Sequence, residues 1–254
     1  MLLIVALFIQ DSLLFLQPDE GVLVRGVRGR WRAGFGTKSW RLAGNEPYIC
    51  NPFTPHAPVF RLRWQMTSTS RQTESAPRTP DGVGAADMAV PQWLLCVLVW
   101  TTWCELFVLV PLALTGTVSV LSPTEVAFLL YFNIALSIVV TWVWRRPLGL
   151  SGKVFAQMAF ECFVCAPYAA NLVRRIGFAQ QVDEDFLEAA ERLLSKEHLR
   201  YARRECLVRI NEQIEVEVGD GGSASTSEEA VSSRLEQLRI ASARLTEEVA
   251  DESE

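Results

Sequence analysis

Residues 93–114 read WLLCVLVWTTWCELFVLVPLAL and carry the strongest fold signal in the chain. A helix needs about 20 apolar residues to cross a bilayer, and this run is long enough. Twelve of its 22 residues are Leu, Val or Phe. Each contributes about −0.3 to −0.6 kcal/mol at a helix centre. Their sum, on the order of −5 kcal/mol, exceeds the roughly 3 kcal/mol cost of one central carboxylate, Glu105. We therefore predict a transmembrane helix here.

A second apolar run, residues 126–144, reads VAFLLYFNIALSIVVTWVW. The preceding tetrapeptide 122–125, Ser-Pro-Thr-Glu, predicts a helix start, because proline fits the first turn and an acid suits the positive end of the helix dipole. Two tryptophans and two arginines close the run at 142–146. Aromatic residues followed by basic ones are typical of a membrane–water boundary. This run predicts a second transmembrane helix.

The charges beside these runs predict their orientation. The connection 115–125 has no Lys or Arg, whereas Arg145, Arg146 and Lys153 follow the second run. Basic residues concentrate on the cytoplasmic side of membrane proteins. The two spans therefore form an antiparallel hairpin with the connection outside and both ends, including the C-terminal tail, in the cytoplasm.

A third apolar stretch, residues 154–173, is less decisive. Only seven of its 20 residues are Leu, Val or Phe, and polar residues between Lys153 and Asn171, including Glu161, recur on one helical face. Two interpretations stay open. One is an interfacial or re-entrant amphipathic helix, and the other is a third span whose polar stripe faces the first two helices. Pro167 predicts that the helix kinks or ends near residue 166.

The net charge of −5 is distributed unevenly over the chain. Residues 1–87 hold ten Lys or Arg against seven Asp or Glu, a net of +3. Residues 88–179 hold five against three, a net of +2, and residues 180–254 hold nine against nineteen, a net of −10. An acidic tail repels nucleic-acid phosphates, so no nucleic-acid partner is expected.

The tail divides into three predicted parts. Residues 180–218 form a charged helical region, with a helix over 182–210. The alternation at 213–218 is compatible with a short strand, which would find a partner strand only in an oligomer. Residues 219–227 are a Gly/Ser-rich linker. Residues 228–254 form an acidic amphipathic helix with an apolar seam of about three heptads. That seam indicates either self-association or binding of a protein partner, or else a solvated helix.

The N-terminal third lacks sustained helical or strand periodicity. Residues 1–16 are apolar but broken by Gln10 and Asp11, so they are at most a marginal anchor. The rest of 1–87 is predicted to be a disordered basic region. A basic and aromatic cluster at 25–32 indicates either attachment to RNA or anionic lipid, or a solvated segment. A further possibility is that translation begins at Met88 and that 1–87 is not made.

Two polar residues inside the predicted spans are candidates for function. Glu105 lies midway along the first span and Asn133 near the middle of the second, so an antiparallel hairpin places them at similar depth. In one interpretation Glu105 gains and loses protons on an ion path. In the other a neutral Glu105 bonds to Asn133 and holds the helices together.

Cys162 and Cys165 form a C-x-x-C pair inside the third apolar stretch. Thiolates of this spacing serve in redox or metal chemistry. The alternative is two small apolar residues packed in a helix. The chain has only two histidines, no recognisable phosphate loop, and neither the G-x-S-x-G nor the H-E-x-x-H pattern. No cofactor is predicted, and the chain is not expected to be an enzyme.

These patterns together predict an all-α membrane protein, and we expect it to lie in a bacterial inner membrane. The membrane domain is 88–176, and a cytosolic helical tail follows it. The expected role is a scaffold or accessory subunit that contacts the lipid bilayer and binds proteins through 228–254. The alternatives are a proton- or ion-conducting subunit that uses Glu105, and a thiol-redox or metal-handling membrane protein that uses Cys162 and Cys165.

Overall fold

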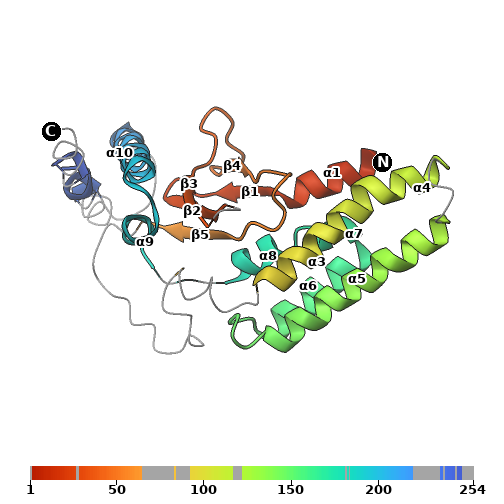
Figure 1. The fold of residues 1–254 in the computed structure, drawn as a ribbon. Coiled ribbons are helices and arrows are strands. Elements are labelled where there is room, and N and C mark those ends of the chain that lie inside the picture. Colours follow the sequence, from red (N-terminus) through yellow and green to blue (C-terminus); the bar gives the residue numbers. More distant parts are fainter. Residues whose placement is uncertain are drawn as a thin grey trace.

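The computed structural model describes residues 2–26, 29–64, 83, 92–116, 122–180, 182, 184–219, 235–236, 238–243 and 245–247. Figure 1 shows a bundle of helices on one side, a small β region in the middle, and α9 and α10 on the other side of the strands. Three apolar clusters hold these parts together: one in the helical bundle and two on the strands.

The described residues between 2 and 63 form one helix and five strands. In chain order these are α1 (Leu2–Asp11), β1 (Leu13–Leu16), β2 (Glu20–Arg25), β3 (Trp31–Gly34), β4 (Glu46–Ile49) and β5 (Val59–Arg63). β1 and β4 form a two-stranded antiparallel sheet, and β3, β2 and β5 form a three-stranded antiparallel sheet in that order.

The prediction of an all-α protein is therefore wrong, because two antiparallel sheets lie within residues 13–63. Residues 1–87 are predicted from the sequence to be a disordered basic region, but the described residues 2–26 and 29–63 include α1 and the five strands just named. The reason is that β2 is covered on both faces. Leu23 and Phe60 pack toward Phe186, whereas Val22 and Val59 pack toward β1. Such a strand has no polar face, so it lacks the alternation that identifies a strand in a sequence.

The helical hairpin follows the N-terminal part. α3 (Gln92–Cys104), η1 (Glu105–Leu109) and α4 (Val110–Leu114) are consecutive and pack beside α5 (Pro123–Trp144). The stretches 93–114 and 123–144 are each long and apolar enough to cross a membrane, judged by length and composition. The predicted start of the second helix is confirmed. Ser122 caps α5, and its hydroxyl and the Glu125 side chain form a reciprocal capping box.

The first helix of the hairpin contains one π-helical turn, η1. The backbone N–H of Val110 donates to the carbonyl of Glu105, five residues earlier. Pro111 follows directly and has no N–H to donate, so the regular ladder is already interrupted at this point. The wider turn changes which side chains face α5. As a result the consecutive residues Glu105 and Leu106 are both buried.

The third apolar stretch is broken into short helices. α6 (Gly152–Val164) ends before Cys165, whose backbone is extended, and α7 (Ala166–Ala169) begins there with Pro167 in its first turn. The predicted break near residue 166 is confirmed. α6 has 13 residues and is therefore about 20 Å long, shorter than the core of a bilayer.

The chain then returns to the end of the bundle from which it came. After α8 (Leu172–Ala179), the side-chain amide of Gln180 donates to the carbonyl of Leu148 at 3.1 Å. Leu148 lies just beyond the C-terminal end of α5. The entry and exit of residues 152–179 are therefore adjacent. Residues 152–179 therefore do not form a third helix that runs from one end of the hairpin to the other.

α8 joins the bundle to the three-stranded sheet at Gly177. A Cβ atom at this position would lie 2.4 Å from the carbonyl oxygen of Val59 in β5. Only glycine allows the helix to approach the strand backbone this closely. The contact fixes the direction of α8, and with it the positions of the two arginines that α8 carries.

α9 (Phe186–Leu193) and α10 (Lys196–Gly219) cover the far face of the sheet. The predicted helix over 182–210 is split at residues 194–195, and the predicted strand over 213–218 is wrong because α10 continues to Gly219. Ala202, Cys206 and Ile210 recur at steps of four and are buried. Helical spacing of this buried face overrides the short alternation at 214–218.

A buried ion pair connects α10 to the N-terminal part. The guanidinium of Arg209 pairs with Glu46 of β4 and donates to the carbonyl of Gly36 at 2.7 Å. Both charged side chains are almost fully buried, at 2% and 0% exposure. The C-terminal seam also packs here, since Leu238 and Leu245 are buried in the same apolar cluster as Ile210.

Candidate functional site

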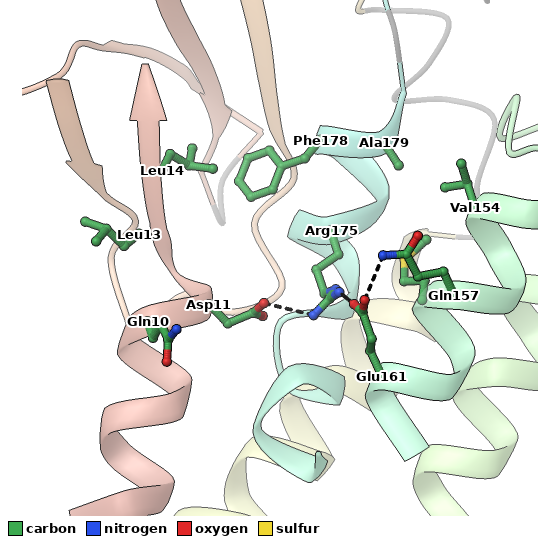
Figure 2. Close-up of a pocket in the computed structure, with 11 residues that line it drawn as sticks. Gln10, Asp11, Leu13, Leu14, Val154, Gln157, Glu161, Arg175, Phe178 and Ala179 are labelled. Atoms are coloured by element: carbon green, nitrogen blue, oxygen red, sulfur yellow. Dashed lines mark hydrogen bonds and ion pairs between the residues drawn. The ribbon is translucent and has the colours of Figure 1, made fainter. Parts of the chain in front are cut away.

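α8 brings two adjacent arginines to the junction of the bundle and the strands. Arg175 donates to Asp11 at the end of α1, with 2.9 Å between the nitrogen and the carboxylate oxygen, and pairs with Glu161 of α6. Gln157 donates to Glu161 at 2.9 Å, one turn earlier on α6. Figure 2 shows Arg175 between the two carboxylates, with all three side chains facing the same cavity. One guanidinium thus joins three helices.

This first cavity has a volume of about 410 Å³ and lies between α1, β1, α6 and α8. Leu14 and Phe178 form an apolar wall opposite the charged side chains (Figure 2). Burial raises the pKa of Asp11 above its usual range, and the nearby Arg175 opposes that rise. The lining residues among the described part of the chain include no Ser, Cys or His, so the cavity offers none of these nucleophiles or general bases. We interpret the Asp11–Arg175–Glu161 cluster as a structural ion-pair network that holds α1, α6 and α8 together.

Arg174 points into a different set of contacts. Its guanidinium donates to Ser12 Oγ at 3.0 Å and to Asn171 Oδ1 at 2.9 Å, and it also donates to the carbonyl of Asn51. Asn171 in turn donates to the carbonyl of Phe8 at 3.2 Å, which fixes α1 against α8. Arg174 is only 1% exposed. It is a buried cation held by neutral acceptors.

The two predicted polar residues of the hairpin do meet. The side-chain amide of Asn133 lies 3.4 Å from a carboxylate oxygen of Glu105, and it donates to Thr102 Oγ1 at 3.1 Å and to the carbonyl of Leu98 at 3.2 Å. Ser137 and Thr141 continue the same buried face of α5. The hairpin interface thus contains a strip of polar side chains beside its buried apolar ones. Neither a proton path nor a purely structural role follows from this contact alone.

The C-x-x-C pair lies on either side of the break in the third stretch. Cys162 is fully buried in α6, and Cys165 is the residue at which that helix ends; both are free thiols. Apolar burial disfavours the thiolate form that redox attack and metal binding require. Within the described residues, no group of three His, Cys, Asp or Glu side chains is arranged to hold a metal ion.

Arg174 and Arg175 with their partners form a polar centre on α8, and the sequence does not identify it as a site. In the sequence Arg174 and Arg175 directly follow the third apolar stretch, which is typical of a basic membrane boundary, and Asp11 interrupts an apolar run. Glu161 was noticed only as part of a polar stripe. The available signal was that charged residues occur inside otherwise apolar stretches, where they need partners. The sequence gives no spacing that pairs them.

Comparison with protein-family models, curated proteins and solved structures finds no match for this chain. The fold and the local geometry are therefore the basis for the functional proposal.

Proposed function

We propose that the chain is an integral membrane protein that serves as a scaffold or accessory subunit in a bacterial inner membrane. In this proposal the hairpin of α3–α4 and α5 spans the bilayer. The strands, α9 and α10 are presented at the cytoplasmic surface. The observation that carries the proposal is that the hairpin exposes large apolar side chains while it buries several polar ones.

The hairpin buries polar groups beside apolar ones and exposes large apolar side chains. On α5 the buried face includes Asn133, Ser137 and Thr141, whereas Phe128 is 71% exposed and Phe132 is 60% exposed. In each candidate span only 33% of the most apolar window is buried within the protein. A core helix of a water-soluble protein would bury its apolar face instead. Lipid is the solvent that favours the observed arrangement.

The path of the chain after α5 supports placing the strands and the C-terminal tail on the same side of the membrane. Residues 152–179 leave and rejoin the same end of the hairpin, where Arg145 and Arg146 follow α5. Under the charge rule that end is cytoplasmic. α6 and α7 then form a re-entrant pair beside the two spans, and α8 leads directly to the sheet.

We retain residues 228–254 as the proposed partner-binding segment. Two members of its apolar seam, Leu238 and Leu245, are buried within this chain. A partner would therefore bind the outer face of that segment, where Ile240 is exposed, or displace the seam from α10.

The topology can be tested with two epitope tags, one after Glu254 and one in the connection 117–121. We expect the C-terminal tag to be reached by antibody only after the cytoplasmic side is opened. The tag in the connection should be reached from the outside of intact spheroplasts. The reason is that one crossing by α5 separates the two positions. Finding both tags on the same side would contradict the proposed arrangement.

A second candidate function, proton conduction, is favoured by one observation: Glu105 is buried at the start of a π-helical turn, and such turns recur at functional sites. We expect Glu105→Gln to leave the passive proton flux of reconstituted liposomes unchanged. We also expect a stability change of only about 0.6 kcal/mol, typical of one polar contact between membrane helices. A pH-sensitive dye inside the liposomes and a thermal melt in detergent measure the two quantities.

Asn133→Leu is the matched comparison, because it removes all three contacts of the amide. It should lower the melting temperature more than Glu105→Gln does. A proton flux in the unaltered protein that Glu105→Gln abolishes would replace the scaffold proposal with the conducting one.

A further inference from the structure

A second cavity, of about 490 Å³, lies beside the three-stranded sheet. Its wall includes Arg174 of α8, Arg30 and Arg32 at the start of β3, and Tyr48 of β4. The loop after β4 completes the wall with Thr54 among others. The volume is within the range of about 300–1,000 Å³ typical of small-molecule sites.

The charge of this cavity is one-sided. Three guanidinium groups line it, and the described lining residues include no Asp or Glu. Arg30 and Arg32 are exposed and have no ion pair with any described residue. Burial raises the pKa of the Cys50 thiol to about 11 and that of Tyr48 to about 12, so neither group supplies a balancing negative charge near neutral pH. The cavity therefore has a strongly positive potential.

Arg174 gives this cavity a buried positive charge, which a surface patch of arginines would lack. Its side chain is 1% exposed, and the three oxygens of Ser12, Asn171 and Asn51 that accept from it are all neutral. The Nε–H has no hydrogen-bond partner within the described protein. Asp11 interacts electrostatically with Arg174, but its carboxylate is already paired with Arg175. A buried guanidinium without a carboxylate and with an unsatisfied donor is costly, and a bound anion would offset that cost.

We propose that this cavity binds the phosphate group of an anionic ligand, with Arg174 at its buried floor and Arg30 and Arg32 at its open rim. Arginine suits this role because its planar donors match two phosphate oxygens at once. Thr54 and Tyr48 add hydroxyl groups to the wall. The cavity is larger than a phosphate alone, so it also accommodates part of the group to which the phosphate is esterified.

The phosphate has two possible sources, a lipid headgroup or a soluble phosphate ester. The loop that walls the cavity contacts α3: the Cys96 thiol donates to the carbonyl of His56 at 3.5 Å, and the His56 ring meets Trp100 edge to face. The cavity is thereby close to the cytoplasmic end of the first proposed span. The lipid source rests on the proposed membrane function, whereas phosphate binding itself does not.

The test uses the full-length protein in a neutral detergent. Its melting temperature is followed against inorganic phosphate, with chloride at the same ionic strength as the reference, and separately against phosphatidylglycerol with phosphatidylcholine as the reference. We expect stabilisation by phosphate or by phosphatidylglycerol, because a ligand that binds only the folded state raises its stability. The double variant Arg30→Gln/Arg32→Gln should weaken the apparent affinity about tenfold or more, as expected for the loss of charge-assisted bonds.

The control is Arg204→Gln/Arg239→Gln, which removes two exposed arginines outside the cavity. It should keep the response of the unaltered protein. A response to phosphatidylglycerol that exceeds the response to phosphate assigns a lipid headgroup, and the reverse assigns a soluble ester; both support the site. No response to either probe overturns the proposal, as does a response that Arg30→Gln/Arg32→Gln leaves intact. If the tag experiment fails while phosphate still binds, only the membrane proposal is lost.

Discussion

A chain that begins at Met88 should not fold, although its apolar runs are complete. Residues 1–87 supply the partners of several buried groups in the rest of the protein. Without them Arg209 loses Glu46, and Arg174 loses the oxygens of Ser12 and Asn51. Removing one partner of a buried charge costs about 3–5 kcal/mol. The loss of Glu46 alone is therefore a large fraction of the whole stability of a typical protein, about 5–15 kcal/mol, and the loss of the neutral partners of Arg174 adds to it.

Apolar packing adds to this expected loss. Phe8 stacks edge to face on Phe107 in the hairpin, with 5.0 Å between the ring centres, and Trp64 packs on Phe186 of α9. Deleting 1–87 exposes the partners of both. Expression of the shortened chain, followed by size-exclusion chromatography and a thermal melt in detergent, measures the effect. Supplying residues 1–87 as a separate co-expressed fragment is the control, and it should recover part of the folded protein.

The outcome also bears on where the protein starts. A shortened chain that purifies as a single species and melts like the full chain would contradict the structural role of 1–87. It would revive the interpretation that translation begins at Met88. Loss of folded protein would show that the N-terminal helix and strands belong to the functional chain.

The hairpin was predictable because its signals are local and repeated. Each apolar run is long enough on its own to indicate a span, and the box formed by Ser122 and Glu125 marks the start of α5 within four residues. The break at Pro167 is local too, because proline cannot continue the hydrogen-bond ladder. Such features need no knowledge of distant parts of the chain.

The strands were missed because their signals depend on tertiary structure. They have four to six residues each, and β1 lies inside an apolar run that also forms α1. β2 buries residues on both faces, and it includes the buried acid Glu20. A buried acid in a strand looks like a surface position until its partner Arg63 is known. The pattern therefore resembled a structureless segment.

The polar centre on α8 was missed for a related reason. Arg174 and Ser12 are 162 positions apart, and Arg175 and Asp11 are 164 apart. No spacing rule connects residues across such a distance. Gly177 lets α8 approach β5, but nothing in the sequence around it indicates that contact. By contrast, the meeting of Glu105 and Asn133 was predictable, because two antiparallel helices of similar length leave few choices of register.

An aspartate placed on the outward face of the hairpin should prevent stable membrane insertion. Phe132 is near the midpoint of α5 and is 60% exposed. On a lipid-facing surface, Phe132→Asp would cost about 3 kcal/mol, since a carboxylate at the centre of a bilayer loses its hydration. On the surface of a water-soluble protein the same change would be nearly neutral. The two environments therefore predict opposite results.

Val216→Asp provides the matched control. Val216 is 55% exposed on α10, a long helix outside the proposed spans, and the substitution introduces the same charge. The measurement is the fraction of the full-length chain that stays in the membrane pellet after alkaline carbonate extraction. We expect the unaltered protein and Val216→Asp to remain in the pellet and Phe132→Asp to be lost from it several-fold. Extraction of the unaltered protein into the supernatant, or equal retention of both variants, would contradict a membrane-spanning hairpin.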